Sequence, residues 1–126
     1  MTIRRLLRRK GLIIEDNPAF IKMVTDILHD HVRLLHATDA EKGLKIAQNK
    51  RPSFILLDIV MPGMDGLEAL KELKSNKRTC TIPVFMLTSE KTIGRMEDAF
   101  QLGAIGYFVK THNLTTLYDR IRKHIG

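Results

Sequence analysis

The 126-residue sequence predicts a single α/β domain in which helices cover both faces of a parallel sheet. Two observations predict this fold class. Short apolar runs, typical of buried strands, alternate with segments whose apolar residues recur every three or four positions, as in amphipathic helices. The composition is 44% hydrophobic and 28% charged, which is enough for one sizeable core and excludes disorder over most of the chain.

Five apolar runs are the expected strands. Each is short and mostly apolar, as in a sheet that is buried on both faces. The runs lie at residues 11–14, 32–36, 54–57, 83–87 and 107–109. The run at 54–57 is the clearest of them, because four consecutive apolar residues stand directly before Asp58.

Segments with helical periodicity separate these runs. Asn17 followed by Pro18 is typical of a helix start, and Asp39 can cap the next helix. The Pro-Gly and Asp-Gly pairs within residues 62–66 indicate a loop, and Gly103 can end the fourth helix. The apolar positions predict helices over about 18–31, 40–47, 67–73, 93–100 and 114–125.

The positive charge is concentrated at the N-terminus. The net charge is +7, and residues 4–10 supply five of the 21 Lys and Arg. We therefore expect a basic N-terminal extension over residues 1–9 and the domain over residues 10–126. A basic arm can bind nucleic acid or an anionic membrane, but a solvated extension is the commoner outcome and the one we expect.

The sequence also predicts a cytoplasmic location. No apolar run approaches the roughly 20 residues that a membrane crossing needs, and the basic start leads into no secretory signal. The single cysteine, Cys80, suits a reducing compartment because it cannot form an internal disulfide.

Polar side chains stand where four of the expected strands end. They are Glu15, Asp16, Asp58, Thr88 and Lys110. In a parallel sheet these ends share one edge, where ligands bind. Clustered carboxylates repel one another without a cation, and ligands that are all oxygen favour Mg²⁺. A carboxylate beside this ion can attack phosphorus to give an aspartyl phosphate, whose oxygens the hydroxyl and ammonium groups can bind.

Four segments together resemble the receiver domain of two-component response regulators. They are Leu-Ile-Ile-Glu-Asp-Asn-Pro at 12–18, Leu-Leu-Asp-Ile-Val-Met-Pro-Gly-Met-Asp-Gly at 56–66, Leu-Thr-Ser at 87–89 and Gly-Ala-Ile-Gly-Tyr-Phe-Val-Lys at 103–110. The resemblance runs from about Lys10 to the C-terminus. It implies a CheY-like, flavodoxin-like doubly wound domain with strand order 2-1-3-4-5 and five flanking helices.

The resemblance implies a role for each residue of the strand-end set. Asp58 would be the phosphoacceptor, and Thr88 and Lys110 would bind the phosphoryl group. Thr88 and Tyr107 would form the switch that couples phosphorylation to a surface of the domain. Mg²⁺ would be held by Glu15, Asp16, Asp58 and the backbone carbonyl of Val60, and no other cofactor is implied.

The implied function is phosphorelay signal transduction. A sensor histidine kinase or phosphotransfer protein would phosphorylate Asp58, and the switched surface would act on a downstream protein target or an output domain. The chain would be a phosphoacceptor switch rather than an enzyme, because it would catalyse only its own phosphorylation and dephosphorylation. Neither nucleic-acid binding by this domain alone nor membrane insertion is expected.

Two positions depart from the family pattern. Thr111 follows Lys110 where many receivers have proline, often after a cis bond, and a cis peptide is far costlier without proline. Val60 and Glu90 occupy positions whose side chains flank the attacking water in this family. Because an apolar Val60 cannot orient that water, we expect slower self-dephosphorylation than with a polar residue there.

Two other function classes stay open. A Mg²⁺-dependent phosphatase or phosphotransferase like the haloacid dehalogenases would use Asp58 as nucleophile, but such enzymes usually carry a second aspartate two residues later, where this chain has Val60. A degenerate receiver that is never phosphorylated would be a binding module. The intact acidic set argues against it, whereas Thr111 and the basic arm favour it, and salt-sensitive DNA binding that needs residues 1–10 would support it.

Overall fold

Five parallel strands form one sheet in the order β2-β1-β3-β4-β5, as predicted. The computed structural model describes residues 8–125. The strands are β1 (Arg9–Ile14), β2 (Val32–Ala37), β3 (Phe54–Asp58), β4 (Val84–Thr88) and β5 (Gly106–Val109). The helices are α2 (Pro18–Leu28), α3 (Ala40–Lys50), α4 (Gly66–Ser75), α5 (Met96–Gln101) and α6 (Leu117–Arg122), with a short 3-10 helix, η1 (Ile93–Arg95), before α5.

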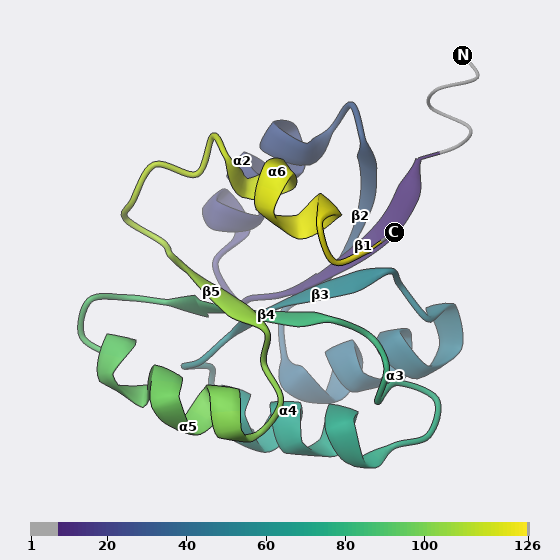
Figure 1. Cartoon of the computed structure of the whole chain (residues 1–126), viewed down its shortest axis with the longest axis vertical. Coiled ribbons are helices and arrows are strands. Elements are labelled where there is room, and N and C mark those ends of the chain that lie inside the picture. Colours follow the sequence, from purple (N-terminus) through teal and green to yellow (C-terminus); the bar gives the residue numbers. More distant parts are fainter. Residues whose placement is uncertain (1–7, 126) are drawn as a thin grey trace.

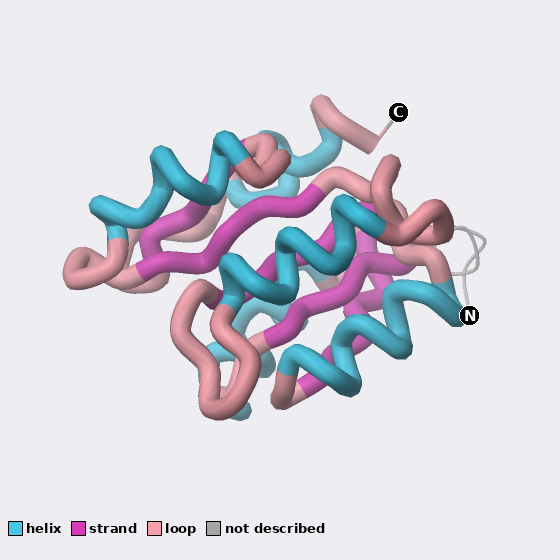
Figure 2. The backbone as a smooth tube through the Cα atoms, turned by 90° about the horizontal axis from the view of Figure 1, so that it is seen from below, coloured by secondary structure: helices cyan, strands magenta, loops and turns pink. Residues whose placement is uncertain are grey.

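Helices cover both faces of the sheet. Helices α2 and α6 pack on one face, and α3, α4 and α5 pack on the other (Figure 1). Seen from below, the helices of the second layer lie side by side and run roughly along the strands (Figure 2). The strands fill both interfaces because successive side chains point to opposite faces: Leu57 of β3 joins the core under α3 and α4, and Leu56 joins the core under α2 and α6.

The first two helices begin at the residues that the predicted caps Asn17 and Asp39 indicate, and the third begins after Asp65, which the sequence indicated only as part of a loop. The Asn17 side chain accepts hydrogen bonds from the backbone N–H groups of Ala19 and Phe20, with Pro18 as the first helical residue of α2. Asp39 and Asp65 cap α3 and α4 in the same way. Such caps satisfy backbone donors that a helix cannot satisfy itself, and they fix where each helix leaves the sheet edge.

The structure differs from the predicted elements mainly in the last two helices. The final helix covers Leu117–Arg122 rather than 114–125, because the chain turns through 113–116 and Thr116 makes no side-chain capping bond. The fourth helix begins as the 3-10 turn η1, and two of its predicted core residues, Ile93 and Phe100, are 41% and 45% exposed. All peptide bonds within 8–125 are trans, including the one that precedes Thr111.

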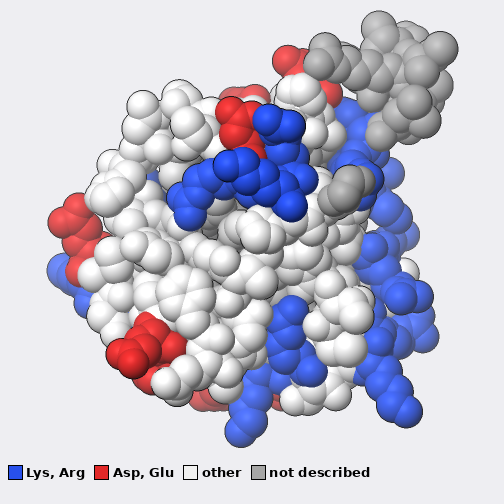
Figure 3. Space-filling view, viewed as in Figure 1, with Lys and Arg blue, Asp and Glu red and all other residues white. Residues whose placement is uncertain are grey.

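Positive charge gathers at the side of the molecule where the strands begin (Figure 3). The exposed residues Lys10, Lys50 and Arg51 lie there, and the Lys10 ammonium contacts the carbonyl oxygen of Lys50 at 3.4 Å. The strands end at the opposite edge of the sheet. Part of the positive charge therefore lies within residues 8–125, and residues 1–7 lie outside the described range.

The lengths of the helices show whether any of them could cross a membrane. The longest helices within residues 8–125, α2 and α3, have 11 residues each, and none in this range is long and apolar enough to cross a membrane.

Candidate functional site

Three carboxylates meet where β1 and β3 end. Glu15 and Asp16 follow β1 directly, and Asp58 is the last residue of β3. These strands pair in parallel, so their carboxyl ends are neighbours. One carboxylate oxygen from each residue lies within 4.8 Å of the other two. The structure thus brings together the three acids that the sequence analysis selected.

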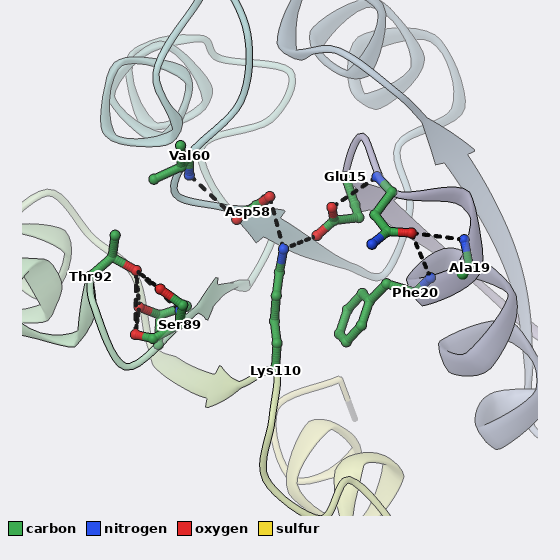
Figure 4. A network of polar contacts seen from close by, with 10 residues as sticks. Glu15, Ala19, Phe20, Asp58, Val60, Ser89, Thr92 and Lys110 are labelled. Carbon is green, nitrogen blue, oxygen red and sulfur yellow. Dashed lines mark hydrogen bonds and ion pairs between the residues drawn. The ribbon is translucent and has the colours of Figure 1, made fainter.

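Lys110 projects from the end of β5 into this cluster (Figure 4). Its ammonium nitrogen, Nζ, lies 2.6 Å from Glu15 Oε1, a short ion pair whose angles are poor for a hydrogen bond. The same nitrogen donates a hydrogen bond to Asp58 Oδ2 at 3.0 Å. The Phe20 ring lies beneath it, 5.3 Å from the ring centre. One cation therefore offsets part of the repulsion between three acids.

Burial gives Glu15 and Lys110 opposite tendencies. Burial raises the pKa of Glu15 to about 7, and the charge of Asp58 adds to this effect, while Lys110 and the backbone N–H of Asn17 oppose it. Burial lowers the pKa of Lys110, but its contacts with Glu15 and Asp58 outweigh burial and raise that pKa overall. Lys110 is consequently a permanent cation, and at neutral pH a proton competes with a metal ion for Glu15.

We expect the metal-free protein to lose stability as the pH rises from 4.5 to 7. Folded Glu15 keeps its proton to higher pH than the unfolded chain does, so the folded state binds more protons in this window. The free energy of unfolding then falls by at most about 1.4 kcal/mol per pH unit. Urea titrations at several pH values in the presence of a chelator measure this slope, and Glu15→Gln should flatten it. Equal slopes for wild type and variant would contradict the prediction.

Asp58 is held on both sides of its carboxylate. Its Oδ1 accepts a hydrogen bond from the backbone N–H of Val60 at 3.3 Å, and its Oδ2 accepts one from Lys110. The Asp58 side chain is only 7% exposed, whereas Val60 is 55% exposed beside it. Asp58 owes this rigid position to β3, whose residues are all buried and which pairs with both β1 and β4.

Thr88 is fully buried at the end of β4, the strand that pairs with β3. Its hydroxyl donates a hydrogen bond to the carbonyl oxygen of Ser89 at 3.1 Å and contacts the hydroxyl of Thr92 at 2.7 Å. Within residues 8–125 no hydrogen bond joins Thr88 to Asp58. The backbone N–H of Lys110 donates to the Thr88 carbonyl oxygen at 2.8 Å, so the two residues are neighbours at the ends of β4 and β5.

Tyr107 lies on β5, two strands away from Asp58. Its half-buried ring packs against the core under α3, α4 and α5, and it meets the Phe100 ring edge-on with 6.2 Å between ring centres. The backbone carbonyl of Tyr107 accepts a hydrogen bond from Arg120 of α6. The ring therefore sits between β5 and α5, outside the cluster of charged groups.

Sequence reasoning missed Gly66 as part of the site. A Cβ atom at this position would lie 2.2 Å from the carbonyl oxygen of Asp58 and 2.6 Å from Cα of Ile59. The Gly66 N–H donates to the Ile59 carbonyl at 2.8 Å. The Asp-Gly pair indicated only a loop, but here glycine is required because α4 starts against the backbone that carries Asp58.

An ion pair that the sequence did not reveal joins the two loops beside the site. The Arg95 guanidinium binds both oxygens of Asp65, at 3.2 and 2.6 Å. Arg95 belongs to η1 after β4, and Asp65 caps α4 after β3. Because 30 residues separate them and neither stands at a strand end, no local pattern could have paired them.

Known proteins resemble this chain over most of its length. The sequence model of a family described as "Response regulator receiver domain" matches residues 12–122. Protein PilH of Pseudomonas aeruginosa is 31% identical over 111 residues, which cover 87% of this chain and 92% of that protein. The transcriptional regulatory protein CiaR of Streptococcus pneumoniae is 33% identical over 113 residues, covering 90% of this chain and 50% of that protein.

Solved structures show the same fold. The receiver domain of a sensor histidine kinase from Pseudomonas aeruginosa PAO1, with a magnesium ion coordinated in its active-site cleft, is 25% identical with a TM-score of 0.85. The match covers 94% of this chain and 98% of that domain. Several curated relatives are longer proteins, and the chain spans half or less of their length.

Proposed function

This chain belongs to the family of response regulator receiver domains, and from that premise we propose that Asp58 accepts a phosphoryl group that switches a protein-interaction surface. The family serves two-component phosphorelay signalling. The observation that carries the proposal is the meeting of Glu15, Asp16 and Asp58 with the Lys110 ammonium at one sheet edge. At this edge the Lys110 ammonium contacts both Glu15 and the proposed nucleophile, Asp58.

Asp58 supplies the nucleophile of the transfer. A carboxylate oxygen attacks phosphorus, and the bond from phosphorus to the donor breaks. The electron pair of that bond leaves with the donor group, which is an imidazole that also takes up a proton, or a carboxylate that needs none. The attacking carboxylate carries no proton, so no general base is required. Hydrolysis later breaks the phosphorus–oxygen bond to Asp58 when water attacks phosphorus, which releases phosphate and restores the carboxylate.

Lys110 and Thr88 bind the transferred group. The Lys110 ammonium already lies 3.0 Å from Asp58 Oδ2, so it is placed to pair with a phosphoryl oxygen on that side chain. The Thr88 hydroxyl would donate its proton to another phosphoryl oxygen. Tyr107 would then respond to the movement of Thr88 and change the surface around β5 and α5.

The acidic cluster fits a magnesium ion. Its donors are all oxygen, which suits a hard ion, and the pKa of the buried Glu15 carboxylate is raised although Lys110 lies beside it, so the cluster has negative charge that Lys110 alone does not compensate. Glu15, Asp16, Asp58 and the Val60 backbone carbonyl would hold the ion. When bound, it neutralises the carboxylates and offers coordination to phosphoryl oxygens.

The proposed switch turns over no external substrate. A phosphatase like the haloacid dehalogenases needs an acid–base aspartate two residues after the nucleophile, and Val60 stands there. The donor would be a sensor histidine kinase or phosphotransfer protein, and the receiver surface would engage a protein target or output domain. The cytoplasm, where the exposed and unpaired Cys80 stays reduced, is the proposed location.

A small phosphodonor tests this function directly. The full chain is incubated with acetyl phosphate and Mg²⁺, and intact-mass spectrometry should show the gain of one phosphoryl group. Reduction with borohydride followed by peptide mapping should place the modification on Asp58. Chelation of the metal should prevent it. Modification of Asp26, an exposed aspartate paired with Lys22, in place of Asp58 would overturn the proposal.

The side chain of Val60 should set how long the phosphoryl group lasts. Val60 is exposed beside Asp58 and offers no hydrogen bond to an attacking water. Val60→Asn should therefore speed dephosphorylation by about 5-fold, the value of one net hydrogen bond. Loss of the phosphoryl mass after removal of the donor measures the rate, and Val60→Ala serves as the apolar control. An unchanged lifetime in Val60→Asn would show that the idea is wrong.

A further inference from the structure

We propose that Thr92 is a positioning residue that holds the Thr88 hydroxyl in a resting place and thereby slows phosphorylation of Asp58. The inference rests on the proposed function of Asp58. It adds a residue that stands at no strand end and lies outside the acidic cluster. Thr92 touches neither Asp58 nor Lys110 by any hydrogen bond within the described chain, so its effect must pass through Thr88.

The Thr92 hydroxyl is the centre of a small hydrogen-bond network (Figure 4). Its Oγ1 lies 2.7 Å from the Thr88 hydroxyl and 3.2 Å from the Ser89 hydroxyl. It accepts a hydrogen bond from the Ser89 backbone N–H at 3.1 Å, and it lies 3.4 Å from the Ser89 carbonyl oxygen. At 2.7 Å, Thr92 lies nearer to the Thr88 hydroxyl than the Ser89 carbonyl oxygen does at 3.1 Å.

These contacts conflict with the position that the phosphorylated site requires. A threonine hydroxyl has one proton to donate, and Thr88 directs its hydroxyl toward Ser89 and Thr92. Donation to a phosphoryl oxygen on Asp58 needs that proton. No hydrogen bond joins Thr88 to Asp58 within the described chain, so the Thr88 side chain has to move to reach that oxygen, and this movement takes its hydroxyl away from Thr92. The hydrogen bond with Thr92 exists only before transfer, and it therefore favours the resting state over the phosphorylated one.

The backbone around Thr92 keeps the residue from following Thr88. The Thr92 N–H donates to the Ser89 carbonyl at 3.1 Å, and the Thr92 carbonyl accepts from the Arg95 N–H at 2.9 Å. Arg95 in turn binds both oxygens of Asp65, which caps α4. The anchor of Thr88 is thus fixed to the loop that follows β3, so release of Thr88 breaks the contact instead of carrying Thr92 along.

Removal of the Thr92 hydroxyl should accelerate transfer but leave hydrolysis unchanged. Thr92→Val keeps the shape of the side chain and should raise the rate of phosphorylation by acetyl phosphate roughly 3- to 10-fold, the range expected for one net hydrogen bond. Dephosphorylation starts from a state in which the contact is already broken, so its rate should stay the same. Thr92→Ser restores a hydroxyl and should return phosphorylation to the wild-type rate.

A double-mutant cycle tests whether Thr92 acts through Thr88. Phosphorylation rates are measured by intact mass for wild type, Thr92→Val, Thr88→Val and the double variant, with Mg²⁺ present. Thr116→Val is the matched control, because Thr116 also precedes a helix without a side-chain capping bond. Acceleration by Thr92→Val in the wild-type background and none in the Thr88→Val background supports the inference.

The outcomes separate this inference from the function on which it rests. If wild type takes no phosphoryl group, the proposed function falls and this inference with it. If wild type is labelled and Thr92→Val changes nothing, or still accelerates transfer without the Thr88 hydroxyl, the inference alone is overturned. Thermal unfolding reports whether Thr92→Val is folded, and Thr92→Ala carries the same expectation should valine disturb the turn.

Discussion

Replacing Asp58 with asparagine should abolish the gain of phosphoryl mass and, at the same time, stabilise the metal-free protein. Asparagine keeps the shape of the side chain, and its single carbonyl oxygen can accept the hydrogen bond of either Val60 or Lys110 but not both. Its amide cannot attack phosphorus. The expected loss of phosphorylation is complete, because the other two acids of the cluster are the proposed metal ligands and not alternative nucleophiles.

The gain in stability comes from relief of repulsion. The charge of Asp58 contributes to the raised pKa of Glu15, so its removal lets Glu15 ionise more readily and pair with Lys110 alone. Near pH 8 and without metal, we expect the free energy of unfolding to rise by on the order of 1 kcal/mol. Addition of Mg²⁺ should stabilise wild type more than the variant, because the variant has lost one proposed carboxylate ligand.

The matched control is Asp26→Asn. Asp26 is an exposed aspartate whose only charged partner within residues 8–125 is Lys22 at 3.0 Å. Its replacement should change neither phosphorylation nor stability by a measurable amount. Phosphorylation that persists in Asp58→Asn would contradict the assignment of the phosphoacceptor. A destabilised metal-free Asp58→Asn would show instead that the Lys110–Asp58 contact outweighs the repulsion.

The sheet and the gathering of the acids could be predicted because both depend on local signals. Four consecutive apolar residues before Asp58 identify a strand that is buried on both faces, and a parallel sheet places the ends of such strands at one edge. The caps Asn17 and Asp39 act through neighbouring residues only, and the helices begin where these caps indicate.

The features that escaped prediction are contacts between segments far apart in the sequence. The pairing of Arg95 with Asp65 and the position of the Phe20 ring under Lys110 depend on how helices pack against the sheet. The Thr92 network joins residues that are close in sequence. Its proposed role depends on the direction of the Thr88 hydroxyl, which the spacing of residues in the sequence does not predict. Helix ends also escaped prediction where no cap was present, as at Thr116.

Adding a single methyl group at Gly66 should destabilise the protein more than adding one at Gly63 or Gly94. Gly66→Ala should lower the free energy of unfolding by about 2–4 kcal/mol, because the new Cβ would lie 2.2 Å from the Asp58 carbonyl oxygen and backbone atoms cannot move aside cheaply. Either α4 must shift away from the sheet or the backbone of Asp58 and Ile59 must move. Movement of that backbone displaces the carboxylate of Asp58 from Lys110, so we expect phosphorylation to slow by roughly 10-fold or more.

Two other glycines separate this steric effect from the general effects of replacing glycine. A Cβ atom at Gly94 of η1 would meet nothing within 4 Å, and Gly94 has no positive φ, so Gly94→Ala should be neutral or slightly stabilising. Gly63 has φ of +82° and the same open space, so Gly63→Ala should lose only about 1 kcal/mol through backbone strain. Urea titration gives the stabilities, and intact mass after reaction with acetyl phosphate gives the rates.

The order of the three alanine variants decides what Gly66 does. If Gly66→Ala is much less stable and slower to react than Gly63→Ala, then close approach of α4 to the Asp58 backbone positions the nucleophile. If Gly66→Ala is as stable as Gly94→Ala and reacts as fast, the start of α4 can move without disturbing β3, and the contact has no part in holding the site. A variant that is stable but slow to react would show that the methyl group displaces the carboxylate while the core stays intact, which is the strongest evidence that this loop sets the geometry of transfer.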